Sequence, residues 1–328
     1  MNKNFKSILT QVVLATSVLA SSSVLADDPL RVTFTHHSAA GNSFWQAVNN
    51  GMKEACELVK ADCQMVFTQT EGDLTQQLSN MEAAVARGTD VLITSIVNDK
   101  VFDSILQKAA NKGIIVLSAN VDDSEGADGS ARLSFIGQNF EAAGYALAKQ
   151  VGSSFPKSGA IHVLVGVSAP GQSWSETRAA GIIRYVEEIM ANEPSRDITY
   201  KRIDSGTDLS VTASRVSAYL GANSNTTAYM ETGPWVAGAA TAVKDRKLKG
   251  KVLLGGFDLI PPVIAGIEDG YINATVDQQP FLQGYLPVIQ AHLMKKYNMG
   301  PWDVNTGRAL VTIDNVDGVA ELAKQGIR

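Results

Sequence analysis

The stretch VLLGGFDLIPPVIAGIEDGYINATVDQQPFLQGY, residues 252–285, carries the pattern that decides the fold. An apolar run, Val252 to Leu254, leads into Gly255-Gly256-Phe257-Asp258. A helical segment with one apolar face follows and ends at a glycine. A second short strand, Ile272 to Val276, then runs into Asp277-Gln278-Gln279-Pro280. Strand, helix and strand in this order predict a βαβ unit of a parallel sheet.

Asp258 and Gln278 each follow one of these two strands. Ligands of parallel α/β sheets bind beyond the carboxyl ends of the strands, so both side chains are candidates for a binding site. A carboxylate accepts hydrogen bonds, whereas an amide both donates and accepts, and the pair therefore suits a polyhydroxy ligand. The alternative is that Asp258 caps the helix and Gln278 is a solvated loop residue.

The composition predicts an ordinary globular protein of about two domains. The chain has 328 residues, of which 45% are hydrophobic and 19% charged. Its formal net charge of −5 argues against a nucleic-acid binder and against a basic membrane-surface protein.

The first 26 residues have the features of a secretory signal peptide. Lys3 and Lys6 precede a mostly apolar core, Ile8 to Leu19, which is too short for a good membrane span. Val24-Leu25-Ala26 offers small residues to signal peptidase, so we expect cleavage after Ala26. No later apolar run is long enough to cross a bilayer, and no cysteine at the junction suggests a lipid anchor. We therefore expect a soluble, exported protein of the periplasm.

The two cysteines fit an oxidising compartment. Cys56 lies late in a predicted helix and Cys63 opens the next strand. Such a compartment favours a disulfide across this short turn. Two buried thiols are the alternative, because sequence alone cannot test disulfide geometry. Two cysteines without clustered histidines do not suggest a zinc site.

Strands and helices alternate along both halves of the chain. The first half predicts strands at Arg31–Thr35, Gln64–Gln69, Val91–Ile96 and Ile114–Leu117, a polar loop at His36–Ser43, and helices at Phe44–Val59, Leu74–Ala86 and Val101–Asn111. The pattern restarts with strands at Ser134–Ile136, Ile161–Val165, Ile198–Ile203 and Thr227–Met230, and helices at Asn139–Val151, Trp174–Ala191, Leu209–Leu220 (capped by Thr207) and Pro234–Lys244. We therefore expect an α/β fold of two doubly wound, Rossmann-like lobes.

Four motifs resemble those of periplasmic sugar-binding proteins of the ribose- and galactose-binding type, the type I periplasmic binding proteins that serve ABC importers. The motifs are NSFWQAVNNGMKEA (42–55), ARGTDVL (86–92), GGFD (255–258) and ATVDQQP (274–280). The resemblance covers about Leu30 to Val311. It implies two lobes joined by three crossing strands, with the ligand in the cleft between them.

The resemblance also implies where the lobes divide. The crossings fall near Gly137, near Gln278 to Pro280, and near Arg308. The N-terminal lobe is then 27–137 plus 280–308, and the C-terminal lobe is 138–279 plus 309–328.

The ligand contacts that the resemblance implies, with nearby candidates, come from both lobes. They are Ser38, Asn42, Phe44, Trp45, Ser95, Asn120, Trp174, Arg178, Thr232, Asp258 and Gln278. At least one of the adjacent rings of Phe44 and Trp45 must point away from the helix's core face, and we expect Trp45 to pack on a sugar ring. The fork of Arg178 can donate two bonds to neighbouring hydroxyls, unless it is a solvated charge paired with Glu176 or Glu187.

Several positions differ from the ribose-binding pattern. Ser95 stands where ribose binders carry Asn, Asn120 where they carry Asp, and Thr232 where they carry another Asn. Val121 replaces an arginine, and Trp174 is a candidate for an added contact. So many changed partners make ribose a poor candidate. We expect another monosaccharide, a deoxy or amino sugar, or a cyclic polyol.

His36 and His37 lie side by side at a strand end, and alternation lets only one of them face the cleft.

Capture of a solute for an ABC permease is the function that these features favour, with no cofactor, no metal and no catalysis. A glycosidase needs two carboxylates beside the scissile bond, and only Asp258 can be placed there from sequence. No hydrolase, zinc-protease or phosphate-loop motif occurs. A sugar-responsive transcription regulator would need a DNA-binding segment before the first strand. A periplasmic accessory protein that reports to a chemoreceptor or a sensor kinase is the alternative that the sequence cannot separate from transport.

Overall fold

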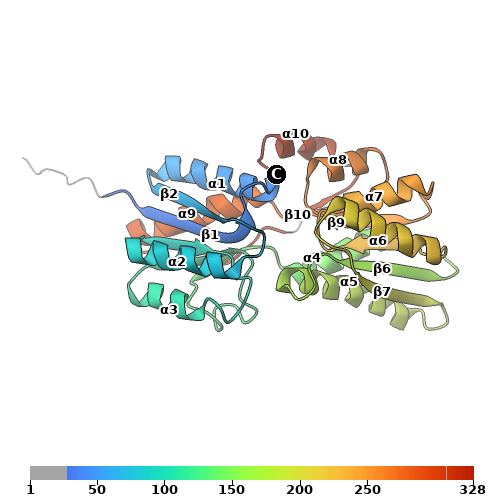
Figure 1. The fold of residues 1–328 in the computed structure, drawn as a ribbon, viewed down its shortest axis with the longest axis horizontal. Helices are drawn as coiled ribbons and strands as arrows, with labels where there is room; N and C mark the ends of the chain where they lie inside the picture. Colours follow the sequence, from blue (N-terminus) through green and yellow to red (C-terminus); the bar gives the residue numbers. More distant parts are fainter. Residues whose placement is uncertain (1–27, 308) are drawn as a thin grey trace, which may run out of the picture.

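The structure, a computed structural model, describes residues 28–307 and 309–328. These residues form two α/β lobes that lie side by side (Figure 1). The predicted signal peptide, 1–26, lies outside the described residues, as do positions 27 and 308 at the predicted lobe limits. Within the described ranges, no helix has both the length and the apolar character needed to cross a membrane.

The sheet of the N-terminal lobe has six parallel strands in the order β11-β5-β4-β3-β1-β2. The strands are β1 (Arg31–Ala39), β2 (Asp62–Thr68), β3 (Val91–Thr94), β4 (Ile115–Asn120), β5 (Ser134–Gly137) and β11 (Val304–Asn305). Helices α1 (Ser43–Val59) and α9 (Pro280–Tyr297) share one apolar cluster with the sheet, and α2 (Leu74–Arg87) and α3 (Asp103–Asn111) share another. The sheet is therefore covered on both faces.

The C-terminal lobe repeats this plan, with strand order β12-β10-β9-β8-β6-β7. The strands are β6 (Ile161–Val167), β7 (Ile198–Asp204), β8 (Ala228–Glu231), β9 (Leu253–Phe257), β10 (Ala274–Asp277) and β12 (Ala309–Val311), of which β12 is antiparallel to β10. Helices α4 (Phe140–Gly152) and α5 (Ser173–Asn192) pack in one cluster. The other cluster holds α6 (Leu209–Ala222), α7 (Val236–Asp245), α8 (Pro261–Glu268) and α10 (Asp317–Lys324).

The predicted fold class is confirmed. Each lobe is a doubly wound sheet, and the βα alternation along the sequence produces it because apolar strands are buried between two helical layers. The quoted stretch 252–285 is the unit β9-α8-β10, and it leads directly into α9. The helix α9 crosses to the N-terminal lobe, where it packs on α1 (Figure 1).

Three chain segments pass between the lobes beside one another. The backbone N–H of Thr306 donates to the carbonyl of Gly137 at 2.9 Å, and the side-chain Nε2 of Gln279 donates to the carbonyl of Thr306 at 2.6 Å. Gln283 of α9 adds bonds to the Gln278 carbonyl at 3.2 Å and to the Thr306 hydroxyl at 3.1 Å. Hydrogen bonds therefore join the three crossing segments to one another.

Two local predictions are wrong. The first strand continues to Ala39, so His36 to Ala39 belong to β1 and not to a loop. His36, His37 and Ser38 are buried there, and hydrogen bonds with Ser95 and Glu71 satisfy the polar side chains of His37 and Ser38. The cap of α6 is Asp208 and not Thr207, because the Asp208 carboxylate accepts bonds from the backbone N–H groups of Ser210 and Val211.

The two cysteines form a disulfide. Cys56 and Cys63 are bonded with their Cα atoms 6.3 Å apart, and the bond closes the turn between α1 and β2. The alternative of two buried thiols is thereby excluded in this structure.

Candidate functional site

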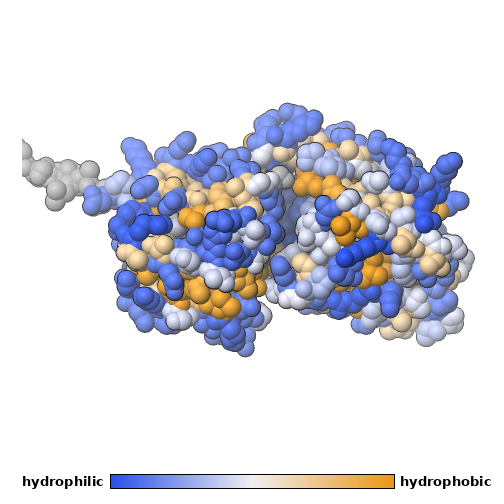
Figure 2. Space-filling model, in the orientation of Figure 1, coloured by the Kyte–Doolittle hydropathy of each residue, from blue (hydrophilic) through white to orange (hydrophobic). Residues whose placement is uncertain are grey.

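A cleft of about 100 Å³ lies between the lobes, where the carboxyl ends of strands from both sheets meet. The space-filling view shows the hollow between the two lobes (Figure 2). The N-terminal lobe contributes His37, Asn42, Phe44, Trp45, Glu71 and Asn120. The C-terminal lobe contributes Phe140, Trp174, Arg178, Pro234, Trp235, Asp258, Ile260 and Gln278. The structure thus brings eight of the eleven predicted contacts to one cavity.

Arg178 is a buried cation whose side chain is fixed on three sides. It is 3% exposed, and its Nε donates to Gln138 Oε1 and its Nη1 to the carbonyl of Thr232, both at 2.9 Å. Its guanidinium lies 4.2 Å from the ring centre of Phe257. The predicted alternative, pairing with Glu176 or Glu187, does not occur, because Glu176 pairs with Arg202 and Glu187 accepts from Tyr200. The Nη2 group has no hydrogen bond to any described residue.

Burial lowers the pKa of Arg178 to about 10, and the nearby Asp258 partly offsets this effect. Arg178 therefore stays charged at neutral pH. Its charge is costly in a dry cleft unless a polar partner meets it.

Asp258 and Gln278 face each other at the ends of β9 and β10. Gln278 Nε2 donates to Asp258 Oδ1 at 2.6 Å. The backbone of Asp258 has φ of +66°, a conformation that Asp and Asn tolerate better than most residues. Burial raises the pKa of the Asp258 carboxyl, while Arg178 and the bond from Gln278 act in the opposite direction. Asp258 does not cap α8, whose first turn has no side-chain cap, so the alternative role is excluded.

Asn120 and Asn42 bring amide groups to the cleft from the N-terminal lobe. Asn120, at the end of β4, also has a positive φ of 71°, and its Nδ2 donates to Gln283 Oε1 at 3.1 Å. Asn42 caps α1, because its Oδ1 accepts from the backbone N–H of Phe44 at 3.0 Å. Through Gln283, Asn120 is joined to α9, and the same glutamine bonds to the crossing segments at Gln278 and Thr306.

Aromatic rings line both sides of the cleft. Trp45 is 2% exposed, stacks on His36 with ring centres 3.8 Å apart, and packs edge-on against Phe34. The partly exposed ring is Phe44, so the expectation that Trp45 points away from the core is wrong, although both rings reach the cavity. On the other lobe, Trp174 and Trp235 lie with ring centres 6.4 Å apart.

Three predicted contacts lie behind the cavity wall. Ser38, Ser95 and Thr232 are fully buried, and each bonds to a residue that lines the cleft. Ser38 bonds to Glu71 and Asn42, Ser95 bonds to His37, and the Thr232 carbonyl holds Arg178. These positions support the site in this structure and do not face the space.

The cavity has lining residues that the sequence reasoning missed: Glu71, Phe140, Pro234, Trp235 and Ile260. Trp235 and Pro234 follow β8 and Ile260 follows β9, so the rule that strand ends form the site could have found them. Phe140 follows the first crossing directly. Glu71 belongs to none of the quoted motifs.

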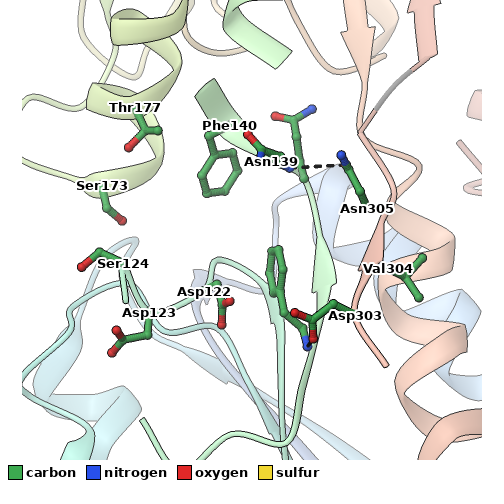
Figure 3. Close-up of a pocket in the computed structure, with 12 residues that line it drawn as sticks. Asp122, Asp123, Ser124, Asn139, Phe140, Ser173, Thr177, Asp303, Val304 and Asn305 are labelled. Atoms are coloured by element: carbon green, nitrogen blue, oxygen red, sulfur yellow. Dashed lines mark hydrogen bonds between the residues drawn. The ribbon is translucent and has the colours of Figure 1, made fainter. Parts of the chain in front are cut away.

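A larger hollow of about 500 Å³ adjoins the cleft and shares Phe140 with it. Figure 3 shows Ser173 and Thr177 of α5 on one side of it and Asp123 and Ser124 on the other. Two of its three carboxylates are paired, since Arg132 binds Asp122 at 2.6 Å and Asp303 at 2.9 Å, while Asp123 accepts from the backbone N–H of Glu125. The smaller cleft places a buried cation, Arg178, near a carboxylate, Asp258, and is the better candidate for ligand recognition.

The described residues contain no group of three or more His, Cys, Asp or Glu side chains placed to hold a metal ion.

Two doubly wound lobes with a polar cleft at their strand ends define the class of two-lobed solute-binding proteins. Residues 37–296 match the family described as periplasmic binding protein domain, and the chain belongs to this family.

Relatives with assigned names are similar over most of the chain. The xylose/arabinose-binding protein XylF of Sulfolobus acidocaldarius is 26% identical over 302 residues, covering 87% of this chain and 72% of its own length. The ribose import binding protein RbsB of Haemophilus influenzae is 24% identical, covering 90% and 94%. The crystal structure of an ABC sugar transporter, a periplasmic sugar binding protein from Legionella pneumophila, superposes with a TM-score of 0.74 at 25% identity, covering 84% and 99%.

Proposed function

We propose that the protein captures a monosaccharide or related polyol in the periplasm and delivers it to an ABC-type permease, without cofactor or catalysis. The single observation that carries this proposal is the arrangement of Arg178 and Asp258. Both line the cleft, and no ion pair within 4.0 Å joins them or either of them to another described residue. One offers donors and the other acceptors, which matches the alternating donor and acceptor character of ligand hydroxyls.

The rest of the cleft suits a sugar ring. The aromatic faces of Phe44, Trp174 and Trp235 offer apolar surfaces to C–H groups, and their placement on both lobes brackets the space. The relatives named for binding xylose and arabinose, and for importing ribose, support the same ligand class. Deoxy sugars, amino sugars and inositols stay within the proposal, because Asn120, which lines the cleft, departs from the ribose-binding pattern.

We propose that the lobes close on the ligand by bending at the three crossings. The bonds among Gly137, Gln279 and Thr306 keep the crossings in register, so a small rotation there moves one lobe as a unit. Closure would surround the ligand with groups from both lobes, and the permease would recognise the closed shape. We also propose that residues 1–26 act as a signal peptide and that the protein works in the periplasm.

Thermal unfolding of the protein without residues 1–26 tests the proposal. The protein is unfolded and refolded to remove any bound solute, then melted with pentoses, hexoses, deoxy and amino sugars, and inositols. A ligand at about a hundred times its Kd stabilises the native state by roughly 2.7 kcal/mol, a shift of several degrees. No shift across the panel would overturn the proposal.

Glu71 adds a second carboxylate to the cleft, so the test includes recovery of the ligand. Two carboxylates are the minimum that a glycosidase uses. We expect the bound sugar, and glycosides of it, to be recovered unchanged after prolonged incubation. Release of a free sugar from a glycoside would show catalysis instead.

A further inference from the structure

Glu71 is a cleft residue held in place by a short chain of hydrogen bonds. It lies between β2 and α2, and Ser38 Oγ donates to its Oε2 at 2.5 Å. Asn42 Nδ2 donates in turn to Ser38 Oγ at 3.2 Å. One carboxylate oxygen is therefore anchored to the N-terminal lobe, while Oε1 has no hydrogen bond to any described residue.

His37 is buried beside this carboxylate. It is 7% exposed, its Nδ1 lies 3.0 Å from Ser95 Oγ, and its Nε2 lies 4.0 Å from Glu71 Oε1. That last distance is too long for a hydrogen bond. An oxygen atom placed between Nε2 and Oε1 can lie within hydrogen-bond distance of both.

The surroundings of His37 favour a ring proton on Nε2. Ser95 Oγ lies 3.0 Å from Nδ1 and can donate its hydroxyl proton to that nitrogen. Nε2 faces the Glu71 carboxylate at 4.0 Å, and a carboxylate favours an N–H group directed towards it. Burial lowers the pKa of His37 to about 4, so the ring is neutral at pH 7.

We propose that Glu71 and His37 together recognise one hydroxyl group of the ligand and thereby set specificity. The hydroxyl donates its proton to Glu71 Oε1 and accepts the Nε2–H bond of His37. A hydroxyl satisfies both groups, whereas an ammonium group has no acceptor for the imidazole proton. The inference rests on the proposed function, because it specifies the chemistry of the ligand in the same cleft.

The test compares one sugar with its monodeoxy derivatives. The probe is the tightest binder among D-xylose, L-arabinose, D-ribose, D-glucose, D-galactose and myo-inositol. Its Kd and those of the derivatives are measured by calorimetry for the wild type, for Glu71→Gln and for the control Glu82→Gln. Glu71 has 53% of its side chain exposed and Glu82 is exposed on α2, so neither change disturbs the core.

One deoxy position should couple to Glu71. We expect removal of that hydroxyl to weaken binding at least tenfold in the wild type and in Glu82→Gln, because a charged acceptor loses its partner. In Glu71→Gln the same removal should cost less than about threefold, since the interaction is already weakened. Replacing that hydroxyl with an ammonium group should weaken binding to the wild type.

Two results would overturn the inference while leaving sugar capture intact. One is that each deoxy derivative loses the same factor in affinity with Glu71→Gln as with the wild type. The other is tighter wild-type binding of the ammonium analogue. A wild type that binds none of these probes and no compound of the thermal-unfolding panel overturns the proposed function itself, and this inference with it.

Discussion

Asp258 and Gln278 are joined by a 2.6 Å hydrogen bond from Gln278 Nε2 to Asp258 Oδ1, which links the ends of two adjacent strands of the C-terminal sheet. The bond fixes the carboxylate at the edge of the cleft, where it approaches the buried Arg178. The second carboxylate oxygen has no bond to any described residue, so it is available to a ligand.

Substitution of Asp258 by Asn should weaken ligand binding by about ten- to a hundredfold, because a charged acceptor is replaced by a neutral amide. Asn also tolerates the positive φ at this position, so the melting temperature of the unliganded protein should change little. Calorimetric titration with the best sugar measures the effect. The control Asp269→Asn, which alters an exposed carboxylate after α8, should bind like the wild type. Unchanged affinity in Asp258→Asn would remove Asp258 from the site.

Much of the fold could be predicted from the sequence because the apolar strands and amphipathic helices alternate strictly. The site was predicted less completely. Trp45 was expected to point away from the core face of its helix, but the extension of β1 brings His36 into the buried sheet, where it stacks on Trp45. Only the three-dimensional packing of two segments determines which ring is buried.

Residues in loops were the hardest to predict. Glu71 lies outside every repeated pattern, and its place in the cleft depends on the path of the loop after β2. Ser38, Ser95 and Thr232 were predicted from the family resemblance, but a resemblance cannot distinguish a side chain that touches the ligand from one that holds its neighbour. Hydrogen-bond partners in the structure make that distinction.

Arg178→Lys should weaken binding at least tenfold although the charge is retained. Lysine cannot replace the planar fork that binds Gln138 and Thr232 through two nitrogens and leaves the third without a hydrogen bond to any described residue. Leaving those buried acceptors without a donor should also lower the free energy of unfolding by about 1–3 kcal/mol. Urea denaturation and calorimetry measure the two effects. Arg184→Lys, on the exposed face of the same helix, is the matched control, and equal behaviour of the two variants would contradict the assignment.

Gly144→Ala should reduce both stability and affinity. A Cβ at Gly144 of α4 would lie 2.1 Å from the carbonyl oxygen of Arg178, so α4 and α5 must separate. The matched control is Gly51→Ala, whose Cβ would lie 2.0 Å from the carbonyl oxygen of Phe281 between α1 and α9. Both should lose about 1–3 kcal/mol of unfolding free energy. We expect the larger loss of affinity in Gly144→Ala, and the reverse order would show that Arg178 is not displaced.

Loss of the disulfide should destabilise the protein without changing ligand affinity. Cys56 and Cys63 are seven positions apart, and closing so short a loop contributes about 2 kcal/mol in the chain-entropy model. The double variant Cys56→Ala, Cys63→Ala should therefore melt several degrees lower. Dithiothreitol should lower the melting temperature of the wild type and leave that of the double variant unchanged. A reagent effect on the double variant would point to another cause.

Glu231 should make stability fall as pH rises from about 4.5 to about 7. This carboxyl is fully buried at the end of β8, where Ser168, Ser205 and the backbone N–H of Thr232 donate to it and Tyr229 contacts it. Burial raises its pKa from 4.5 to about 7, although the bonds act in the opposite direction. The folded state therefore holds the proton more strongly than the unfolded state.

The sign of the pH effect follows from linkage. The stabilising contribution of the protonated Glu231 is fully present below pH 4.5 and is lost as the pH rises through about 7. Its size is at most about 3 kcal/mol. Buried His36 and His37 have the opposite effect, because burial lowers their pKa values to about 2 and about 4, so their contribution is lost as the pH falls below 6.5.

A difference measurement separates these effects. Glu231→Gln keeps the acceptor oxygen for Ser168, Ser205 and Thr232 but cannot ionise, whereas both histidines are unchanged. Relative to the wild type, this variant should gain stability steadily from pH 4.5 to 7.5 in urea denaturation. Glu187→Gln, which alters an exposed carboxylate of the same lobe, should show no such trend. Parallel pH profiles for Glu231→Gln and the wild type would mean that Glu231 is ionised in the folded protein throughout this range.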